Sequence, residues 1–435
     1  MGVAIDGAQA PEPPATPAPS PVQPETRPAT MKAPEGVTAA LAPKPAAPVP
    51  LLSDIVKAYL DHRATKLGDR RADEGDGRVL EFMLALLGDR PTDQIGKTDL
   101  ALLETALAEI PNRTGVPKRS VGSMHKRYLY AQENGWARLT RLGEKTLRNT
   151  YFRTINNFLA FARAKTDWSA PDYPFNTVPQ SAQKAQPRDA FSMEELTRLF
   201  RLPLFTGCAN STHVWAQGPL LVQSHSYWGF LLLFFCGMRP SEIGKLTLDD
   251  IVQEQGIWFA DLRDGRQETG KTPRKRALKT QVAYRRVPLP PLLIELGLIE
   301  RVQEMKRRKQ TRLFPEWAVY KHPQSGREMW GHALSKVWQY VKRTFKFDRD
   351  FLTLYSGRHT RAGWYDDLNL PQRTRNRLLG HKSKDVADNY GPIHLSHEEA
   401  KLAIGRQTEA EKEIGRILLE AKKRADAGEL TLVVM

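Results

Sequence analysis

The chain has 435 residues and carries 65 Lys and Arg against 49 Asp and Glu, a formal net charge of +16. This length allows more than one hydrophobic core, and the basic excess favours a polyanionic partner. Two cysteines argue against a disulfide framework or a cysteine zinc site and suit a reducing cytosol. No apolar run reaches about 18 residues, so no membrane span is expected. The first residues lack the pattern of a signal peptide.

The chain begins with a segment unlike the rest. Residues 1–50 hold 13 of the 31 prolines. Such a composition cannot bury a core and predicts a disordered tail. Its formal charge is −1, so residues 51–435 carry +17. Residues 51–166 repeat apolar side chains at helical spacing, beginning with Leu52 and Ile55, and predict a small helical domain.

Several basic residues of this helical domain are candidates for DNA contact. Four of them lie between its third and fourth helices, and two lie on the outer side of the fourth, which is expected at residues 144–165. The alternative is an ordinary solvated face. The six candidates are Lys118, Arg119, Lys126, Arg127, Arg148 and Arg153.

The proline-rich residues 167–188 predict a linker, and residues 189–395 a second domain. Ser192 and Glu195 form a capping box that begins a helix. An almost wholly apolar stretch, 227–236, predicts a buried helix. The runs 257–262 and 284–289 predict two strands joined by a long basic hairpin tip. Further helices are expected at 291–307, 331–344, 356–368, 371–379, 384–390 and 396–427. The predicted fold class is therefore mainly α with a small antiparallel β-sheet.

Four segments of the second domain carry residues suited to phosphodiester chemistry. They are GMRPSEIGKL with Arg239, ALKTQVAYRRVPL with Lys279, YSGRHT with Arg358, and LLGHKSKDVADNY with His381 and Tyr390. Two guanidinium groups can grip the oxygens of one phosphate by bidentate hydrogen bonds. A lysine can donate a proton, and a tyrosine hydroxyl can attack phosphorus. The set indicates DNA strand cleavage without a metal ion.

In the order and spacing of these segments the chain resembles the tyrosine recombinase (phage integrase) family. The resemblance covers roughly residues 189–400 by motif and 51–166 more loosely by helical pattern. It implies a tyrosine recombinase catalytic domain preceded by a helical, SAM-like core-binding domain that lies across the DNA from it. It also implies a site-specific recombinase (integrase) of the kind found on mobile elements, which cleaves and rejoins DNA strands through a 3′-phosphotyrosyl intermediate and needs neither ATP nor another cofactor. The sequence leaves integration versus excision, and mobile-element versus host origin, open.

The resemblance also implies a role for each residue. Arg239 and Arg358 would clamp the phosphate, and Lys279 would give a proton to the departing 5′ oxygen. His381 would hydrogen-bond the phosphate, and Tyr390 would be the nucleophile. Other lysines of the hairpin, Lys271 and Lys275, compete with Lys279 for the proton-donor role, and Tyr365 is a competing nucleophile.

One position departs from the family. A histidine usually stands three residues before the second arginine, where this chain has Tyr355. A phenol can hydrogen-bond a phosphate oxygen but is a poor proton acceptor at neutral pH. Whether Tyr355 replaces the histidine is therefore open. His359 follows Arg358 directly, and neighbouring side chains on a helix diverge by about 100°, so His359 is expected to be structural.

The expected partners are double-stranded DNA, three further copies of the chain in a homotetramer, and accessory DNA-bending proteins. No membrane partner is expected, and the expected location is the bacterial cytoplasm at the nucleoid. Residues 396–435 form a helix and tail with a narrow apolar stripe. This stripe either docks on a neighbouring protomer, as an oligomerisation segment, or packs on its own domain.

Two other functions fit the same residues. A type IB topoisomerase uses the same chemistry as a monomer. A non-catalytic DNA-binding regulator could keep the fold without the reaction, and the tyrosine at position 355 leaves this alternative open.

Overall fold

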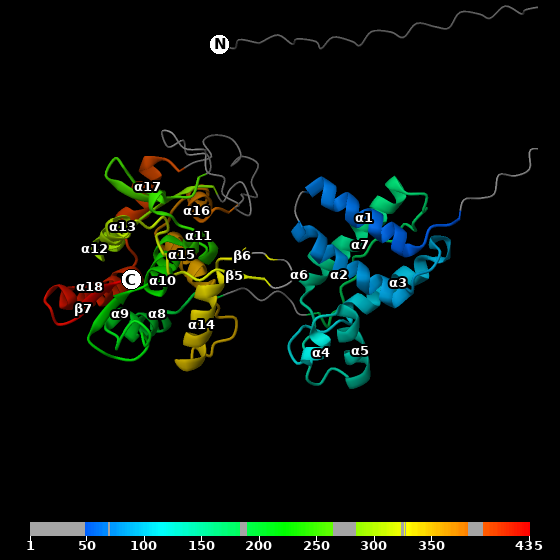
Figure 1. The fold of residues 1–435 in the computed structure, drawn as a ribbon, viewed down its shortest axis with the longest axis horizontal. Helices are drawn as coiled ribbons and strands as arrows, with labels where there is room; N and C mark the ends of the chain where they lie inside the picture. Colours follow the sequence, from blue (N-terminus) through cyan, green and yellow to red (C-terminus); the bar gives the residue numbers. More distant parts are fainter. Residues whose placement is uncertain are drawn as a thin grey trace, which may run out of the picture. The chain divides into compact units, whose positions relative to one another are not determined.

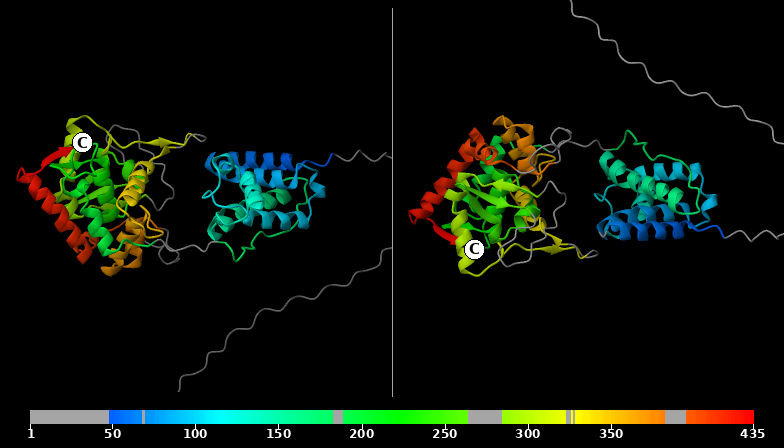
Figure 2. Two further views of the ribbon diagram at one scale, coloured as in Figure 1. Left: turned by 90° about the horizontal axis from the view of Figure 1, so that it is seen from below. Right: turned by 90° about the horizontal axis from the view of Figure 1, so that it is seen from above.

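A computed structural model describes residues 48–67, 70–182, 189–263, 284–322, 326, 328–381 and 395–435 (Figures 1 and 2). These residues form two large hydrophobic cores. The side chains of one core come from the range 52–182, and those of the other come from the range 191–430. They define an N-terminal helical region and a C-terminal region. Across the described residues, no helix combines the length and the apolar character that a membrane span requires. Residues 1–47 of the predicted tail lie outside the described residues.

The N-terminal helical region is built from amphipathic helices, as predicted. Leu52 and Ile55 are buried in its core. The helix expected at 144–165 is a continuous series of three segments, the middle one a π-helix. The elements are α1 (Leu52–Leu67), α2 (Arg70–Leu87), η1 (Thr92–Gln94), α3 (Lys97–Ala108), α4 (Lys118–Val121), α5 (Met124–Asn134), α6 (Glu144–Thr146), η2 (Leu147–Phe152) and α7 (Arg153–Lys165).

The predicted linker needs a correction. Aromatic side chains of residues 167–182 are buried in the first core. The Glu104 carboxylate of α3 also holds this stretch, because it accepts hydrogen bonds from the Tyr173 hydroxyl (2.8 Å) and the Asn176 amide (2.8 Å). Residues 167–182 therefore belong to the helical region. The remainder of the predicted linker, 183–188, lies outside the described residues.

The C-terminal region is organised around α10 (His225–Cys236), which is buried along nearly its whole length. An all-apolar helix is stable where other elements cover every face, and α10 packs against α14 and α15. The capping box of Ser192 and Glu195 begins α8 as predicted. The other helices before the C-terminal segment are α8 (Met193–Phe200), α9 (Pro203–Thr206), α11 (Pro240–Gly244), η3 (Leu248–Asp250), α12 (Pro291–Glu295), α13 (Leu298–Arg307), α14 (His332–Thr344), α15 (Ser356–Asp367) and α16 (Gln372–Leu379).

A three-stranded antiparallel sheet of β2 (Ile251–Glu254), β3 (Ile257–Asp261) and β4 (Arg286–Pro288) lies beside these helices. It confirms the predicted strands and the predicted fold class. The connection between β3 and β4 contains residues 264–283, which lie outside the described residues. Two short strands, β5 (Tyr320–Lys321) and β6 (Glu328–Met329), form a separate antiparallel pair.

The C-terminal segment contains two helices where one was predicted. They are α17 (His397–Gly405) and α18 (Glu409–Asp426), and a capping box of Thr408 and Glu411 starts the second. The chain then forms β7 (Thr431–Val434), which pairs in parallel with β1 (Leu220–Gln223). Figures 1 and 2 show α18 and β7, in red, lying along the C-terminal region.

The apolar stripe of α18 is covered by its own chain. Ile414, Ile417, Leu418 and Ala421 are buried, and α18 packs against α8 and α9. Of the two alternatives for this stripe, the structure shows packing on its own domain, and a role of residues 396–435 in oligomerisation stays a prediction.

Candidate active site

The site begins where α10 ends. Gly237 terminates this helix with φ +61°, in the left-handed region that favours glycine. A Cβ atom there would also lie 2.7 Å from Cδ2 of Leu379. The chain therefore turns tightly and places Arg239 directly before α11, whose first residue is Pro240. Proline is favoured at that position because its fixed φ suits a helix start.

Arg239 is held by α11 and by the end of α16. Its Nη1 donates to Oε1 of Glu242 (2.6 Å) and its Nη2 donates to the carbonyl of Gly380 (3.0 Å). The backbone N–H of Arg239 donates to Oε2 of Glu242 (2.9 Å). About a quarter of the side chain stays exposed, at 23%. A fixed but accessible guanidinium is what the predicted phosphate clamp requires.

Arg358 lies in the first turn of α15 and is buried, with 1% of its surface exposed. Its Nη1 donates to the carbonyl of Gly237 and its Nη2 to the carbonyl of Leu379. Its Nε is buried and has no hydrogen-bond partner among the residues that the structure describes.

A third guanidinium belongs to the same cluster, and the sequence analysis missed it. Arg285 precedes β4, and its Nε donates to the carbonyl of Leu378 (2.8 Å). Its Nη1 and Nη2 donate to the two oxygens of Glu242, each at 3.1 Å. The sequence contained a weak signal in the RRVPL run, where a charged residue precedes a buried strand.

The three guanidinium groups grip three consecutive carbonyls. Arg285 binds that of Leu378, Arg358 that of Leu379, and Arg239 that of Gly380. These carbonyls close α16, where a helix has unpaired acceptors and the negative end of its dipole. Gly380 has φ +61° and turns the chain directly into His381. The position of His381 is therefore set by the arginine cluster.

The cluster shifts the pKa of its members. Burial opposes ionisation of Glu242, but Arg285 and Arg239 outweigh it and lower the pKa of Glu242 to about 2. Burial, then the charges of Arg285 and Arg239, lower the pKa of Arg358 to about 10. Partial desolvation beside the cluster, then the positive charges of the cluster, lower the pKa of His381 to about 4, although the residue remains exposed to solvent. At neutral pH the site combines positive guanidinium groups with a neutral imidazole.

Tyr355 lies at the edge of this cluster, just before α15. Its hydroxyl hydrogen-bonds Arg239. Its ring meets the His359 ring edge-on, with centroids 5.3 Å apart. His359 also acts electrostatically on His381. The histidine expected to be structural thus borders the site.

Two predicted catalytic residues, Lys279 and Tyr390, lie outside the described residues, as do Lys271 and Lys275. The competing nucleophile Tyr365 is described and is buried, with 1% exposure. Its ring lies 4.1 Å from the Arg361 guanidinium, inside the core. Tyr365 is therefore inaccessible to DNA.

The basic candidates of the helical region divide into two groups. Lys118, Arg119, Lys126 and Arg153 are exposed. Arg148 is exposed as well, but it pairs with Glu144 at 2.8 Å. The prediction that Arg127 contacts DNA needs correction, because Arg127 is buried and donates to the carbonyl of Pro111 (2.8 Å). Its guanidinium stabilises the fold and faces no solvent.

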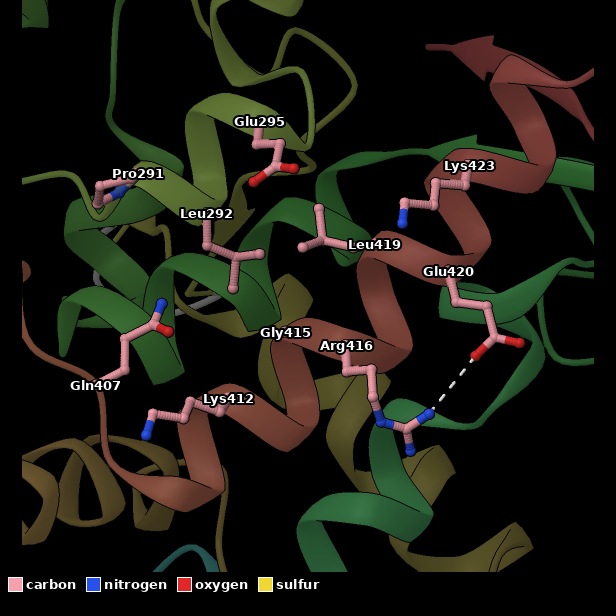
Figure 3. Close-up of a pocket in the computed structure, with 10 residues that line it drawn as sticks. All are labelled: Pro291, Leu292, Glu295, Gln407, Lys412, Gly415, Arg416, Leu419, Glu420 and Lys423. Carbon is pink, nitrogen blue, oxygen red and sulfur yellow. Dashed lines mark ion pairs between the residues drawn. The ribbon is translucent and has the colours of Figure 1, made fainter.

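A surface pocket lies apart from this cluster. Figure 3 shows it between α12 and α18, with Leu292, Leu419 and several charged side chains around it. The pair of Arg416 and Glu420, 3.9 Å apart, lies on its α18 side. None of the residues that line the pocket belongs to the arginine cluster.

The chain was compared with known proteins. No family model and no curated protein sequence matches it. Solved structures similar to it include the Tn1549 transposon integrase with transposon right-end DNA, at TM-score 0.48 and 17% identity, covering 82% of this chain and 99% of that one. A lambda integrase tetramer bound to a Holliday junction has TM-score 0.46 and 12% identity, covering 78% and 79%. The XerH site-specific recombinase bound to difH has TM-score 0.40 and 15% identity, covering 85% and 95%.

Proposed function

We propose that this chain is a site-specific DNA recombinase that cleaves and rejoins DNA strands through a 3′-phosphotyrosyl intermediate. One observation carries the proposal: Arg239, Arg285 and Arg358 converge on the turn that ends at His381. Tyr390 follows nine residues later in the sequence. A positive, rigid cluster is suited to an anionic phosphoryl transition state, and a tyrosine hydroxyl is a suitable nucleophile for it.

The proposed reaction begins when the Tyr390 hydroxyl attacks the phosphorus of a phosphodiester. A bond forms between phosphorus and the tyrosine oxygen, and the bond from phosphorus to the 5′ oxygen breaks. Lys279 gives the 5′ oxygen its proton. The proton that Tyr390 loses passes to water, and the imidazole of His381 hydrogen-bonds a phosphate oxygen. Arg239 and Arg358 stabilise the added negative charge.

Strand exchange follows from the same chemistry in reverse. A 5′ hydroxyl from a second duplex attacks the phosphotyrosine, and the tyrosine leaves. One phosphate ester replaces another at each step, so the bond energy is conserved and no ATP is required. We further propose that the protein works as a homotetramer on two DNA sites and that DNA-bending proteins assist it. The exposed basic side chains of the helical region, Lys118 among them, would contact DNA backbone.

The test is the capture of protein on DNA. The substrate is a library of duplexes with randomised sequence and a nick in one strand. Cleavage near the nick releases a short fragment that ends in the free 5′ hydroxyl. Because this fragment diffuses away, the reaction cannot reverse and the protein stays attached to the DNA. The proposal predicts a denaturant-resistant protein–DNA band for the wild type and for the control Tyr365→Phe, and none for Tyr390→Phe. Sequencing the trapped DNA gives the target site.

Further outcomes separate the alternatives. A wild-type chain that binds duplexes but forms no adduct would be a DNA-binding regulator. An adduct-forming chain that relaxes supercoiled DNA but never joins strands of two duplexes would be a topoisomerase. Either result would overturn the recombinase proposal.

A further inference from the structure

We propose that Arg285 is a positioning residue for strand cleavage, which holds Arg239 and the turn carrying His381 in their places. This inference rests on the function proposed above. The guanidinium of Arg285 joins two elements that are far apart in the sequence. It binds Glu242 in α11 through two hydrogen bonds of 3.1 Å, and the Leu378 carbonyl of α16 through one of 2.8 Å.

The first contact orients Arg239. Glu242 is buried, with 3% of its surface exposed, and its Oε1 accepts from both Arg285 and Arg239. Arg285 engages both carboxylate oxygens, so the plane of the carboxylate is fixed by a forked pair of hydrogen bonds. A fixed carboxylate in turn fixes the direction of the Arg239 guanidinium. Without Arg285, the buried carboxylate would lose one of the two cationic partners that it has among the described residues.

The second contact orients His381. Leu378 supplies the first of the three carbonyls that the cluster grips, and its bond to Arg285 sets the end of α16 against the strand that follows Arg285. The His381 amide then donates back to the carbonyl of Asn376 (2.9 Å). His381 thus leaves a helix end that Arg285 holds against the sheet.

Arg285 acts on these groups without touching a substrate. Its side chain is 6% exposed, so a phosphodiester outside the protein reaches Arg239 and not Arg285. Its charge is nevertheless felt at His381. Among the described residues, the charged groups that act on this imidazole are Arg358 and His359 from α15, Arg239 beside α11, and Arg285 beside β4. Together with partial desolvation they lower the pKa of His381, so loss of the Arg285 charge should raise this pKa.

The chain offers a matched control. Arg301 in α13 is also buried, with 0% exposure. It pairs with the Glu316 carboxylate at 2.8 Å and donates to the carbonyls of Leu313 (3.1 Å) and Gln223 (2.7 Å). The same kind of network thus exists in the same core, but outside the candidate site. Arg301→Gln reports the cost of breaking such a network without disturbing the proposed chemistry.

The experiment compares the full-length chain with Arg285→Gln, Arg285→Lys and Arg301→Gln. Two quantities are measured on each. The first is the pKa of the His381 imidazole by NMR titration, assigned with His381→Gln. The second is the single-turnover rate of adduct formation on a trapped nicked duplex. Melting temperature and the Kd for that duplex are recorded alongside.

Arg285→Gln should raise the pKa of His381 and slow adduct formation by roughly 10- to 100-fold, the size of effect seen when groups that orient metal ligands are lost. The Kd should stay near that of the wild type. Arg285→Lys keeps the positive charge but loses the paired hydrogen bonds to the two Glu242 oxygens. It should therefore keep the low pKa of His381 and still cleave slowly. Arg301→Gln should melt earlier yet, once folded, cleave at the wild-type rate with an unchanged His381.

The proposal is overturned if Arg285→Gln cleaves like the wild type, or if Arg301→Gln slows cleavage as much as Arg285→Gln does. Cleavage at the wild-type rate by Arg285→Lys would also overturn the proposal. If Arg285→Gln does not fold, the cleavage rate of Arg285→Lys alone tests the positioning role. A wild type that forms no adduct would instead sink the proposed function. The His381 titration would then still report whether Arg285 acts on that imidazole.

Discussion

At the residue scale, the two proposed clamp arginines differ in how they meet the rest of the protein. Arg239 is partly exposed and turns one face to solvent. Arg358 is buried, and both of its terminal nitrogens donate hydrogen bonds to backbone carbonyls. We infer that Arg239 is the first to meet the phosphate, and that Arg358 contributes its remaining N–H groups and its charge from behind.

Replacement by lysine tests both clamps. Arg239→Lys and Arg358→Lys should each slow cleavage by about 10²–10³, the usual loss when one preorganised donor of an oxyanion site is removed. A lysine keeps the charge but cannot reproduce the forked donor pair. Single-turnover adduct formation measures the effect, with the exposed Arg343→Lys as the control. Wild-type cleavage by either site variant would remove that arginine from the proposed mechanism.

His381 makes the stability of the protein depend on pH. Its pKa is about 4 in the folded chain, against a usual value of 6.5. At pH values between about 4 and 6.5, His381 is protonated in the unfolded chain but neutral in the folded chain. The free energy of unfolding therefore falls as the pH drops from about 6.5 to about 4. Urea unfolding across this range should show a larger loss for the wild type than for His381→Gln. Equal losses would mean that this imidazole titrates normally.

At the element scale, α18 belongs to the same unit as the arginine cluster. The buried pair of Arg361 and Glu411 ties α18 to α15, the helix that carries Arg358. The apolar stripe of α18 packs on α8 and α9. Disturbing α18 should therefore disturb the site.

Leu418→Ala tests this packing. Leu418 is fully buried, and deletion of a buried leucine typically costs about 2–5 kcal/mol. The variant should melt at a lower temperature in the transition of the C-terminal region, and the transition of the helical region should stay in place. Leu402→Ala in α17 is the control, because Leu402 is 36% exposed. An unchanged melting profile for Leu418→Ala, with weaker self-association, would mean that the stripe docks on a neighbouring protomer.

Local signals predicted most elements well, and distant contacts were the part that they could not predict. The capping box of Ser192 and the apolar run of α10 act over one or two turns, so the sequence reveals them directly. The packing of residues 167–182 depends on Glu104, more than 60 positions earlier, and proline content suggested a linker instead. Arg127 looked like its basic neighbours until the fold placed the Pro111 carbonyl beside it.

The candidate site shows the same division. The motifs supplied Arg239, Arg358 and His381, which the structure brings to one cluster. Arg285 escaped notice because its role arises from two partners on other elements, Glu242 and Leu378. The role of Arg285 becomes visible only when the fold brings α11, which carries Glu242, and the end of α16, which carries Leu378, to the same guanidinium.

At the scale of the whole molecule, the positive charge lies outside the first 50 residues, which carry −1 against +17 for the rest. Affinity for DNA should therefore come from residues 51–435 and fall steeply with salt. Deleting residues 1–48 should leave the Kd, its salt dependence and the rate of adduct formation unchanged. The deletion spares Pro50, whose carbonyl accepts from the Thr92 amide (3.0 Å). A marked loss of binding would assign the tail a part in DNA recognition.

The central claim is that one tyrosine carries the DNA, and mass spectrometry of the trapped adduct tests it most directly. Digesting the wild-type adduct with trypsin and nuclease should leave one peptide that bears a nucleotide. We predict that this peptide contains Tyr390, linked to the 3′ phosphate of the cleaved strand. A nucleotide on any other residue, or a phosphate joined through the 5′ end, would contradict the account.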